Sequence, residues 1–170
     1  MSRLDSFIRR LEAQRACLDH AAGLIADLPG PVLELGLGNG RTYDHLRERL
    51  PGRDIFVFER SVAAHPECVP PPERLILGDM RETLRRVRDR FAGQAALAHL
   101  DAATGDVAAS LALAAELAPL IAPLLRHGGG VLISEPPLDL PAADWTALPL
   151  PAGIEPGRYH LYRASDGRKS

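Results

Sequence analysis

The chain has 170 residues, enough for one domain that buries a sizeable core but too few for a typical two-domain enzyme. It is 46% hydrophobic and 25% charged, which is typical of globular proteins and excludes a disordered or fibrous chain. The formal net charge is -2 at pH 7, so the chain lacks the positive field that draws proteins to nucleic acid, and we expect no nucleic-acid partner.

The cysteines and the hydropathy pattern indicate the cellular location of the protein. Cys17 and Cys68 are the two cysteines, and their wide separation fits neither a disulfide framework nor a zinc cluster. The most apolar stretch, residues 107–125, is interrupted by a glutamate and two prolines, and the charged N-terminus differs from a signal peptide. We therefore predict a cytoplasmic protein with no membrane partner.

Residues 3–28 predict an amphipathic helix. Apolar side chains recur there at steps of three, four and seven residues, namely Leu4, Ile8, Leu11, Leu18, Ala22 and Ile25. A polar stripe lies opposite them and comprises Arg9, Arg10, Glu12 and Asp19. A Pro-Gly-Pro sequence at 29–31 ends the helix, which makes residues 1–29 a helical N-terminal extension.

Strand and helix patterns then alternate along the chain. Short apolar runs predict strands at 32–36, 54–59, 74–79, 96–101 and 130–135. Helices are predicted at 41–50, 80–91 and 106–127, the last with Asp106 as its cap, whereas the four prolines of residues 61–73 leave little room for one. This alternation predicts parallel strands joined by right-handed crossovers.

The C-terminal part predicts a hairpin. Residues 136–156 contain six prolines, residues 157–165 alternate like a strand, and residues 147–151 are a weak candidate for its antiparallel partner. We find no internal repeat and no linker. The sequence therefore predicts one doubly wound α/β domain over residues 1–170, with a mostly parallel sheet.

The most informative motif lies where the first strand meets the following helix. It runs through Glu34, Gly36, Gly38, Asn39 and Gly40. Glycines at alternate positions let backbone amides approach a ligand that a Cβ would exclude. A dinucleotide fingerprint starting at Gly36 requires a glycine at position 41, where the chain has arginine. Glu34 either bonds nearby backbone amides to shape the turn or contacts the ligand directly.

This acidic-x-Gly-x-Gly-x-Gly pattern resembles the first motif of class I S-adenosylmethionine-dependent methyltransferases. The resemblance covers roughly residues 30–135, and the short chain is similar to a family of compact bacterial methyltransferases. It implies a Rossmann-like methyltransferase fold that binds S-adenosylmethionine, with the motif residues against the cofactor and Glu34 toward its ammonium group.

The resemblance assigns further cofactor contacts to the ends of the next strands. It implies that Glu59, followed by Arg60, accepts hydrogen bonds from both ribose hydroxyls. Asp79 would accept a hydrogen bond from the adenine amino group, and Met80 would line the adenine slot. Asp101 would face the methionine moiety and the incoming substrate.

The implied reaction is an in-line methyl transfer, in which the protein orients the reactants and excludes water. A base is needed for a hydroxyl or ammonium acceptor, and the candidates are Asp101, Tyr43 and His99. His99 shares the face of Asp101, although a core histidine is the simpler interpretation. Asp101 and Glu135 together supply too few ligands for a magnesium site, so we expect no metal.

The acceptor is expected to be a small molecule. Residues 101–104 lack the Asn/Asp-Pro-Pro-aromatic motif with which amino-directed DNA and RNA methyltransferases act on bases. Segments that bind larger substrates in longer relatives are short here, which leaves the N-terminal helix and residues 136–156 to cover the substrate.

Two other functions remain open at this point. An NAD(P)-dependent oxidoreductase would explain the fold and Glu59 but not the glycine spacing. A non-catalytic S-adenosylmethionine-binding module or accessory subunit would explain the short substrate segments. The helix over residues 107–125 is apolar nearly all round, so we expect it to be buried on more than one side and to form a homo-oligomer interface.

Overall fold

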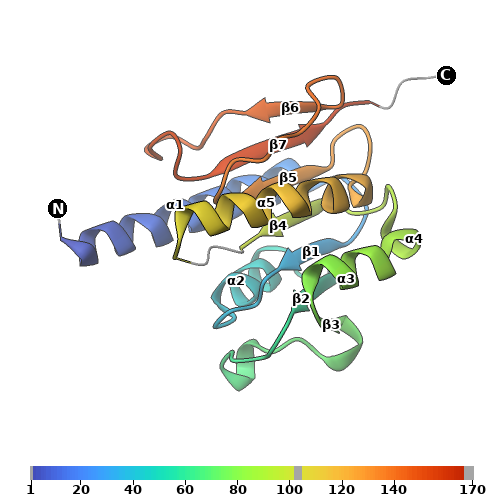
Figure 1. Cartoon of the computed structure of the whole chain (residues 1–170), viewed down its shortest axis with the longest axis horizontal. Helices are drawn as coiled ribbons and strands as arrows, with labels where there is room; N and C mark the ends of the chain where they lie inside the picture. Colours follow the sequence, from blue (N-terminus) through green and yellow to red (C-terminus); the bar gives the residue numbers. More distant parts are fainter. Residues whose placement is uncertain (1, 102–104, 167–170) are drawn as a thin grey trace.

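A single seven-stranded sheet organises the chain (Figure 1). The computed structural model describes residues 2–101 and 105–166. The sheet has the order β3-β2-β1-β4-β5-β7-β6, and the five strands from β3 to β5 are parallel. The strands are β1 (Val32–Leu35), β2 (Ile55–Glu59), β3 (Leu75–Leu77), β4 (Leu97–Leu100), β5 (Val131–Ser134), β6 (Trp145–Leu148) and β7 (His160–Ala164).

The antiparallel end of the sheet confirms the predicted C-terminal hairpin. β7 pairs antiparallel with β5 on one side and with β6 on the other. β6 begins two residues before the segment predicted at 147–151. The doubly wound, mostly parallel α/β fold is therefore confirmed.

Helices cover both faces of the sheet, so the central strands are buried on both sides. Helices α1 and α2 pack on one face, and α3, α4 and α5 pack on the other. The α-helices are α1 (Arg3–Leu24), α2 (Arg41–Arg49), α3 (Met80–Arg86), α4 (Arg88–Phe91) and α5 (Val107–Ile121). Short 3₁₀ turns occupy η1 (Pro66–Cys68), η2 (Pro72–Arg74) and η3 (Ala122–Leu124).

Three predicted helices are shorter than their sequence patterns. α1 ends at Leu24, and the Arg53 guanidinium takes up carbonyl oxygens beyond its end, including that of Leu28 at 2.6 Å. The helix predicted over 80–91 divides at Val87, whose φ of -95° and ψ of 3° are not helical. α5 ends at Ile121 because Pro123 has no amide hydrogen to continue the helical ladder.

Within the single chain the sheet covers one side of the apolar helix, and the other side is exposed. Val107 and Leu111 of α5 are 76% and 42% exposed, while Leu117 is fully buried against the sheet. Glu116 on the exposed side forms an ion pair with Arg81 of α3. By length and composition, the window Val107–Leu124 is apolar enough to cross a membrane, with a mean hydropathy of 1.8, but in this fold it packs along the sheet.

Leu117→Ala tests which side of α5 carries the packing. Removal of a fully buried leucine should lower the free energy of unfolding by about 2 to 5 kcal/mol through lost burial and a residual cavity. Leu111→Ala on the side of the same helix that the single chain leaves exposed is the matched control and should lower the free energy of unfolding by clearly less than Leu117→Ala. Urea unfolding measures both, and equal losses would contradict this placement of α5.

Candidate functional site

Glycines shape the turn between β1 and α2. Gly36 has a φ of +105°, and a Cβ there would lie 2.3 Å from the Asp101 carbonyl oxygen, so β1 and β4 approach this closely because the residue is glycine. Gly40, the N-cap of α2, has a φ of +85°, and its Cβ would lie 2.5 Å from that of Cys68. Among the described residues, none has an atom within 4 Å of a Cβ on Gly38. The turn is therefore packed at both ends and open in the middle.

Glu59, at the end of β2, holds this turn from the neighbouring strand. One carboxylate oxygen accepts from the amides of Leu37 at 2.8 Å and Gly38 at 3.1 Å. The other accepts from the amides of Arg60 at 2.7 Å and Ser61 at 3.3 Å. Burial raises the pKa of Glu59, but these four amides outweigh burial, so its net pKa lies below the ordinary value and the carboxylate stays ionised.

The end of β3 carries a second carboxylate beside the first. Asp79 caps α3 by accepting from the Arg81 amide at 2.9 Å, and it pairs with the Arg60 guanidinium at 2.9 Å. Met80 follows it and packs partly against the core. Asn39, in the glycine turn, accepts from the Arg41 amide at 3.4 Å. The carboxylates of Glu59 and Asp79 thus follow neighbouring strands, with Arg60 between them.

Glu34 has a different position from the one expected. It is fully buried, and its two carboxylate oxygens bond to the Thr42 hydroxyl and to Nδ1 of His99, the latter at 2.8 Å. Its described hydrogen bonds therefore go to side chains of α2 and β4, rather than to the turn amides or toward open solvent. Burial lowers the pKa of His99, but the charge and hydrogen bond of Glu34 outweigh burial and raise it overall.

A second polar cluster joins α1 to the carboxyl ends of β4 and β5. Arg10 donates to both carboxylate oxygens of Glu135, at 2.9 and 2.8 Å, and its Nη2 lies 3.8 Å from Asp101. Gln14, one turn later, donates to Asp101 at 3.1 Å. The side chains of Asp101 and Glu135 are each 25% exposed. We call Arg10, Gln14, Asp101 and Glu135 the α1 clamp.

Sequence reasoning missed the roles of Arg10 and Gln14. Arg10 was expected on the polar stripe of the N-terminal helix, but it turns toward the sheet edge and is only 36% exposed. Gln14 is 8% exposed, which is unusual for an amide and could have been suspected from its place beside the apolar stripe. The partners of Arg10 lie 91 and 125 residues away, so no local pattern identifies them.

The other two base candidates differ from Asp101 in their surroundings. Tyr43 is buried in the apolar cluster of α1, α2 and the sheet, with the Arg47 guanidinium 5.7 Å from its ring centre. His99 is held by Glu34, and the structure gives its Nε2 no hydrogen-bond partner among the described residues. Residues 102–104 belong to the segment that lacks the motif of amino-directed DNA and RNA methyltransferases, and they lie outside the described residues.

A metal site is not assembled by the residues described here. No group of three or more histidine, cysteine or carboxylate side chains is gathered in 2–101 and 105–166. The two carboxylates weighed as magnesium ligands, Asp101 and Glu135, instead share the guanidinium of Arg10. A positive charge of the chain therefore occupies the position between them.

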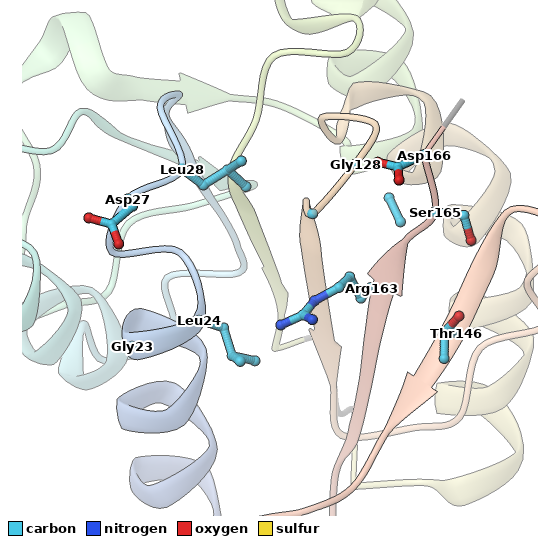
Figure 2. Close-up of a pocket in the computed structure, with 11 residues that line it drawn as sticks. Gly23, Leu24, Asp27, Leu28, Gly128, Thr146, Arg163, Ser165 and Asp166 are labelled. Carbon is cyan, nitrogen blue, oxygen red and sulfur yellow. The ribbon is translucent and has the colours of Figure 1, made fainter. Parts of the chain in front are cut away.

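Two cavities lie at opposite ends of the sheet. One, of about 440 Å³, adjoins the α1 clamp at the carboxyl ends of the strands. Figure 2 shows the other, of about 540 Å³, between the end of α1 at Leu24 and Asp27 and the end of β7 at Arg163 and Ser165. Open α/β sheets bind their ligands at the carboxyl ends of the strands, so the first cavity belongs to the candidate site.

Comparisons with known proteins agree with this geometry. A family model described as S-adenosyl-L-methionine methyltransferase matches residues 1–164. The crystal structure of an S-adenosyl-L-methionine methyl transferase from Silicibacter pomeroyi DSS-3 shares 48% identity and a TM-score of 0.91, covering 96% of this chain and 99% of its own. No curated protein sequence matches the chain.

More distant structures share the fold alone. Human methyltransferase-like protein 13, solved in complex with S-adenosylhomocysteine, has 13% identity and a TM-score of 0.51 over 98% of this chain and 82% of its own. An O-methyltransferase family protein from Burkholderia thailandensis has 16% identity and a TM-score of 0.51 over 88% and 55%.

The buried pair of Glu34 and His99 predicts a pH-dependent stability. Because the pKa of His99 is raised on folding, protonated His99 stabilises the fold fully below its ordinary value of 6.5, and this contribution is lost as pH rises through the raised value. The free energy of unfolding should therefore exceed that of His99→Asn by more at about pH 6 than at about pH 9. Asn keeps a donor near the Nδ1 position, which limits the disturbance.

Urea unfolding at the two pH values measures this gap in stability between wild type and His99→Asn. A gap that stays constant or widens toward high pH would contradict a protonated His99 beside Glu34.

Proposed function

Because the chain belongs to this S-adenosyl-L-methionine methyltransferase family, we propose that it transfers the methyl group to a small-molecule acceptor bound at the carboxyl ends of β4 and β5. The enzyme class and the cofactor follow from the family. Membership favours methyl transfer over the NAD(P)-dependent oxidoreductase and over the non-catalytic binding module.

The residues at the edge of β1, β2 and β3 fit the cofactor. The open space over Gly38 admits a ligand against the turn amides, and Glu59 offers an ionised carboxylate for the ribose hydroxyls. All four of its lone-pair directions are in use, so ribose binding would replace the two longest contacts, from Gly38 at 3.1 Å and Ser61 at 3.3 Å. Asp79 and Met80, on the next strand end, would hold the adenine.

The strand order supports a position for the reaction at the end of β4. A cofactor whose adenosine spans β3 and β2 extends its methionine end past the glycine turn of β1 toward Asp101 of β4. When bound, S-adenosylmethionine supplies an electrophilic methyl group on a positively charged sulfur. Asp101, held by Gln14, would orient the reactants and accept a proton from the acceptor, while α1 covers this edge and excludes water.

The size of the cavity beside the α1 clamp carries the proposal of a small acceptor. It measures about 440 Å³, within the range of small-molecule sites. Its walls come from α1, α5 and the loop after β5, and thus include the N-terminal helix expected to cover the substrate and the start of the Pro-rich segment. A macromolecular acceptor would need a contact surface wider than this cavity.

The exposed side of α5 supports a further proposal, a homo-oligomer. Val107 and Leu111 expose large apolar surfaces there, and small residues such as Ala108, Ala112 and Ala115 lie on the same exposed side. A second copy of the chain that packs α5 against α5 would bury this side in an isologous contact.

Glu59→Gln tests the cofactor site. The wild-type protein should bind S-adenosylmethionine and S-adenosylhomocysteine and give no heat with NADH in parallel calorimetric titrations. Glu59→Gln removes the charge that accepts the ribose hydroxyls, so affinity for S-adenosylhomocysteine should fall about tenfold or more. Glu67→Gln, an acid with an 85% exposed side chain on the following loop, is the control and should bind normally. Unchanged affinity in Glu59→Gln would overturn the ribose assignment.

Ala112→Glu tests the oligomer. Wild type should sediment with at least twice the mass of one chain, and a charge in the middle of the exposed side of α5 should return it to the monomer. Ala63→Glu, also exposed but distant in sequence, should leave the assembly unchanged. A monomeric wild type in sedimentation velocity would remove the proposal.

A further inference from the structure

The cavity beside the α1 clamp has one apolar end and one charged end. Val107 and Leu111 of α5, together with Pro136 and Pro137, form apolar walls. Arg10 and Glu135 lie at the polar end. A ligand that fills this space therefore presents a compact apolar body to α5 and one polar head to the clamp.

Negative charge dominates the polar end. The described lining residues include one cation, Arg10, and two carboxylates, Glu135 and Asp106. Asp101 adds a third carboxylate, 3.8 Å from the Arg10 guanidinium. Three carboxylates against one guanidinium leave an excess of two negative charges, and partly buried charges interact strongly because solvent screens them less.

An anionic head finds few donors in this cavity. The start of α5 would ordinarily attract an anion, but Asp106 already accepts from the amides of Ala108 and Ala109 at 2.9 and 3.2 Å. The fork of Arg10 is taken by both oxygens of Glu135. An incoming carboxylate or phosphate would have to displace one carboxylate and lie beside another.

A cationic head, in contrast, would fit the position that the Arg10 guanidinium occupies. Arg10 belongs to α1, whereas Glu135 and Asp101 end two neighbouring strands of the sheet that carries the cofactor site. The Arg10 guanidinium thus lies at the position, between Glu135 and Asp101, where the edge of the sheet binds a positive charge. With its side chain 36% exposed, Arg10 can move aside without unfolding α1.

We infer that the methyl acceptor is a small amine with an apolar body, whose ammonium head replaces Arg10 between Glu135 and Asp101. This inference rests on the proposed methyl transfer and names its substrate class. The product would be the N-methylated amine, and Arg10 would act as an internal competitor that occupies the acceptor position when no amine is bound.

The step balances with the groups present. The bound ammonium first gives one proton to the carboxylate of Asp101, the base of the proposed function, which leaves a lone pair on nitrogen. That lone pair attacks the methyl carbon, so the N–C bond forms while the S–C bond breaks and its electron pair stays on sulfur. Positive charge thereby passes from sulfur to the methylated nitrogen, beside Glu135 and Asp101.

Calorimetry with matched probes tests the acceptor class without the natural substrate. The protein is first saturated with S-adenosylhomocysteine, which reports the cofactor site separately. It is then titrated with 2-phenylethylamine and phenylpropionate, and with hexylamine and hexanoate, two pairs that differ in the charge of the head. Each amine should bind at least about tenfold more tightly than its acid partner, a difference of about 1.4 kcal/mol.

Variants of the clamp sharpen the test. Glu135→Gln should weaken amine binding about tenfold, whereas Arg10→Gln should strengthen it several-fold because the competitor is gone. Arg15→Gln, an exposed arginine on the same helix, is the matched control and should leave binding unchanged. With S-adenosylmethionine in place of the product, mass spectrometry should detect the N-methylated amine.

Three results would overturn the inference while S-adenosylhomocysteine still binds. The first is that the acids bind as tightly as the amines, and the second is that neither class binds. The third is that amine affinity falls in Arg10→Gln, because Arg10 would then be part of the binding surface rather than a competitor of the amine. Loss of S-adenosylhomocysteine binding in the wild type would instead refute the proposed function from which the inference starts.

Discussion

A carboxylate buried beneath the glycine turn sets the geometry of this site. Glu34 has no exposed surface, and leaving it without partners would cost several kcal/mol. Its bonds to Thr42 and His99 tie β1 to α2 and β4, directly under the glycine turn. The close approach of Gly36 to Asp101 follows from the same alignment of β1 with β4. The positions of the glycine turn and of Asp101 are therefore coupled through the buried pair of Glu34 and His99.

Two acidic residues of similar appearance in the sequence have different surroundings in the structure. Glu59 stays partly exposed and is bonded by backbone amides, so it can exchange contacts with a ligand. Glu34 is bonded by side chains and closed off from solvent, so its contribution is to architecture. The two carboxylates therefore have different tasks. Glu34 fixes the structure beneath the glycine turn, whereas Glu59 beside the turn can change its hydrogen-bond partners.

The sequence was sufficient for features that depend on local patterns. Apolar runs located the five parallel strands, and the glycine pattern located the turn between β1 and α2, because both are consequences of neighbouring residues. The sequence could not predict contacts between residues that lie far apart in the chain, such as Arg10 with Glu135. It also could not predict the break between α3 and α4, which depends on the backbone angles of the single residue Val87. Hydropathy reports how apolar α5 is but not which of its sides the same chain covers, so only the structure identifies the exposed side.

The strand order at the antiparallel end has a consequence for how the protein is made. β7 follows β5 and β6 in the chain, lies between them in the sheet and pairs with both. Tyr159 and Leu161 near its start also join the apolar cluster beneath α1, which precedes every strand. Neither the sheet nor the packing of α1 can therefore be completed before β7 has been synthesised. During translation, the folding of this domain has to wait for β7.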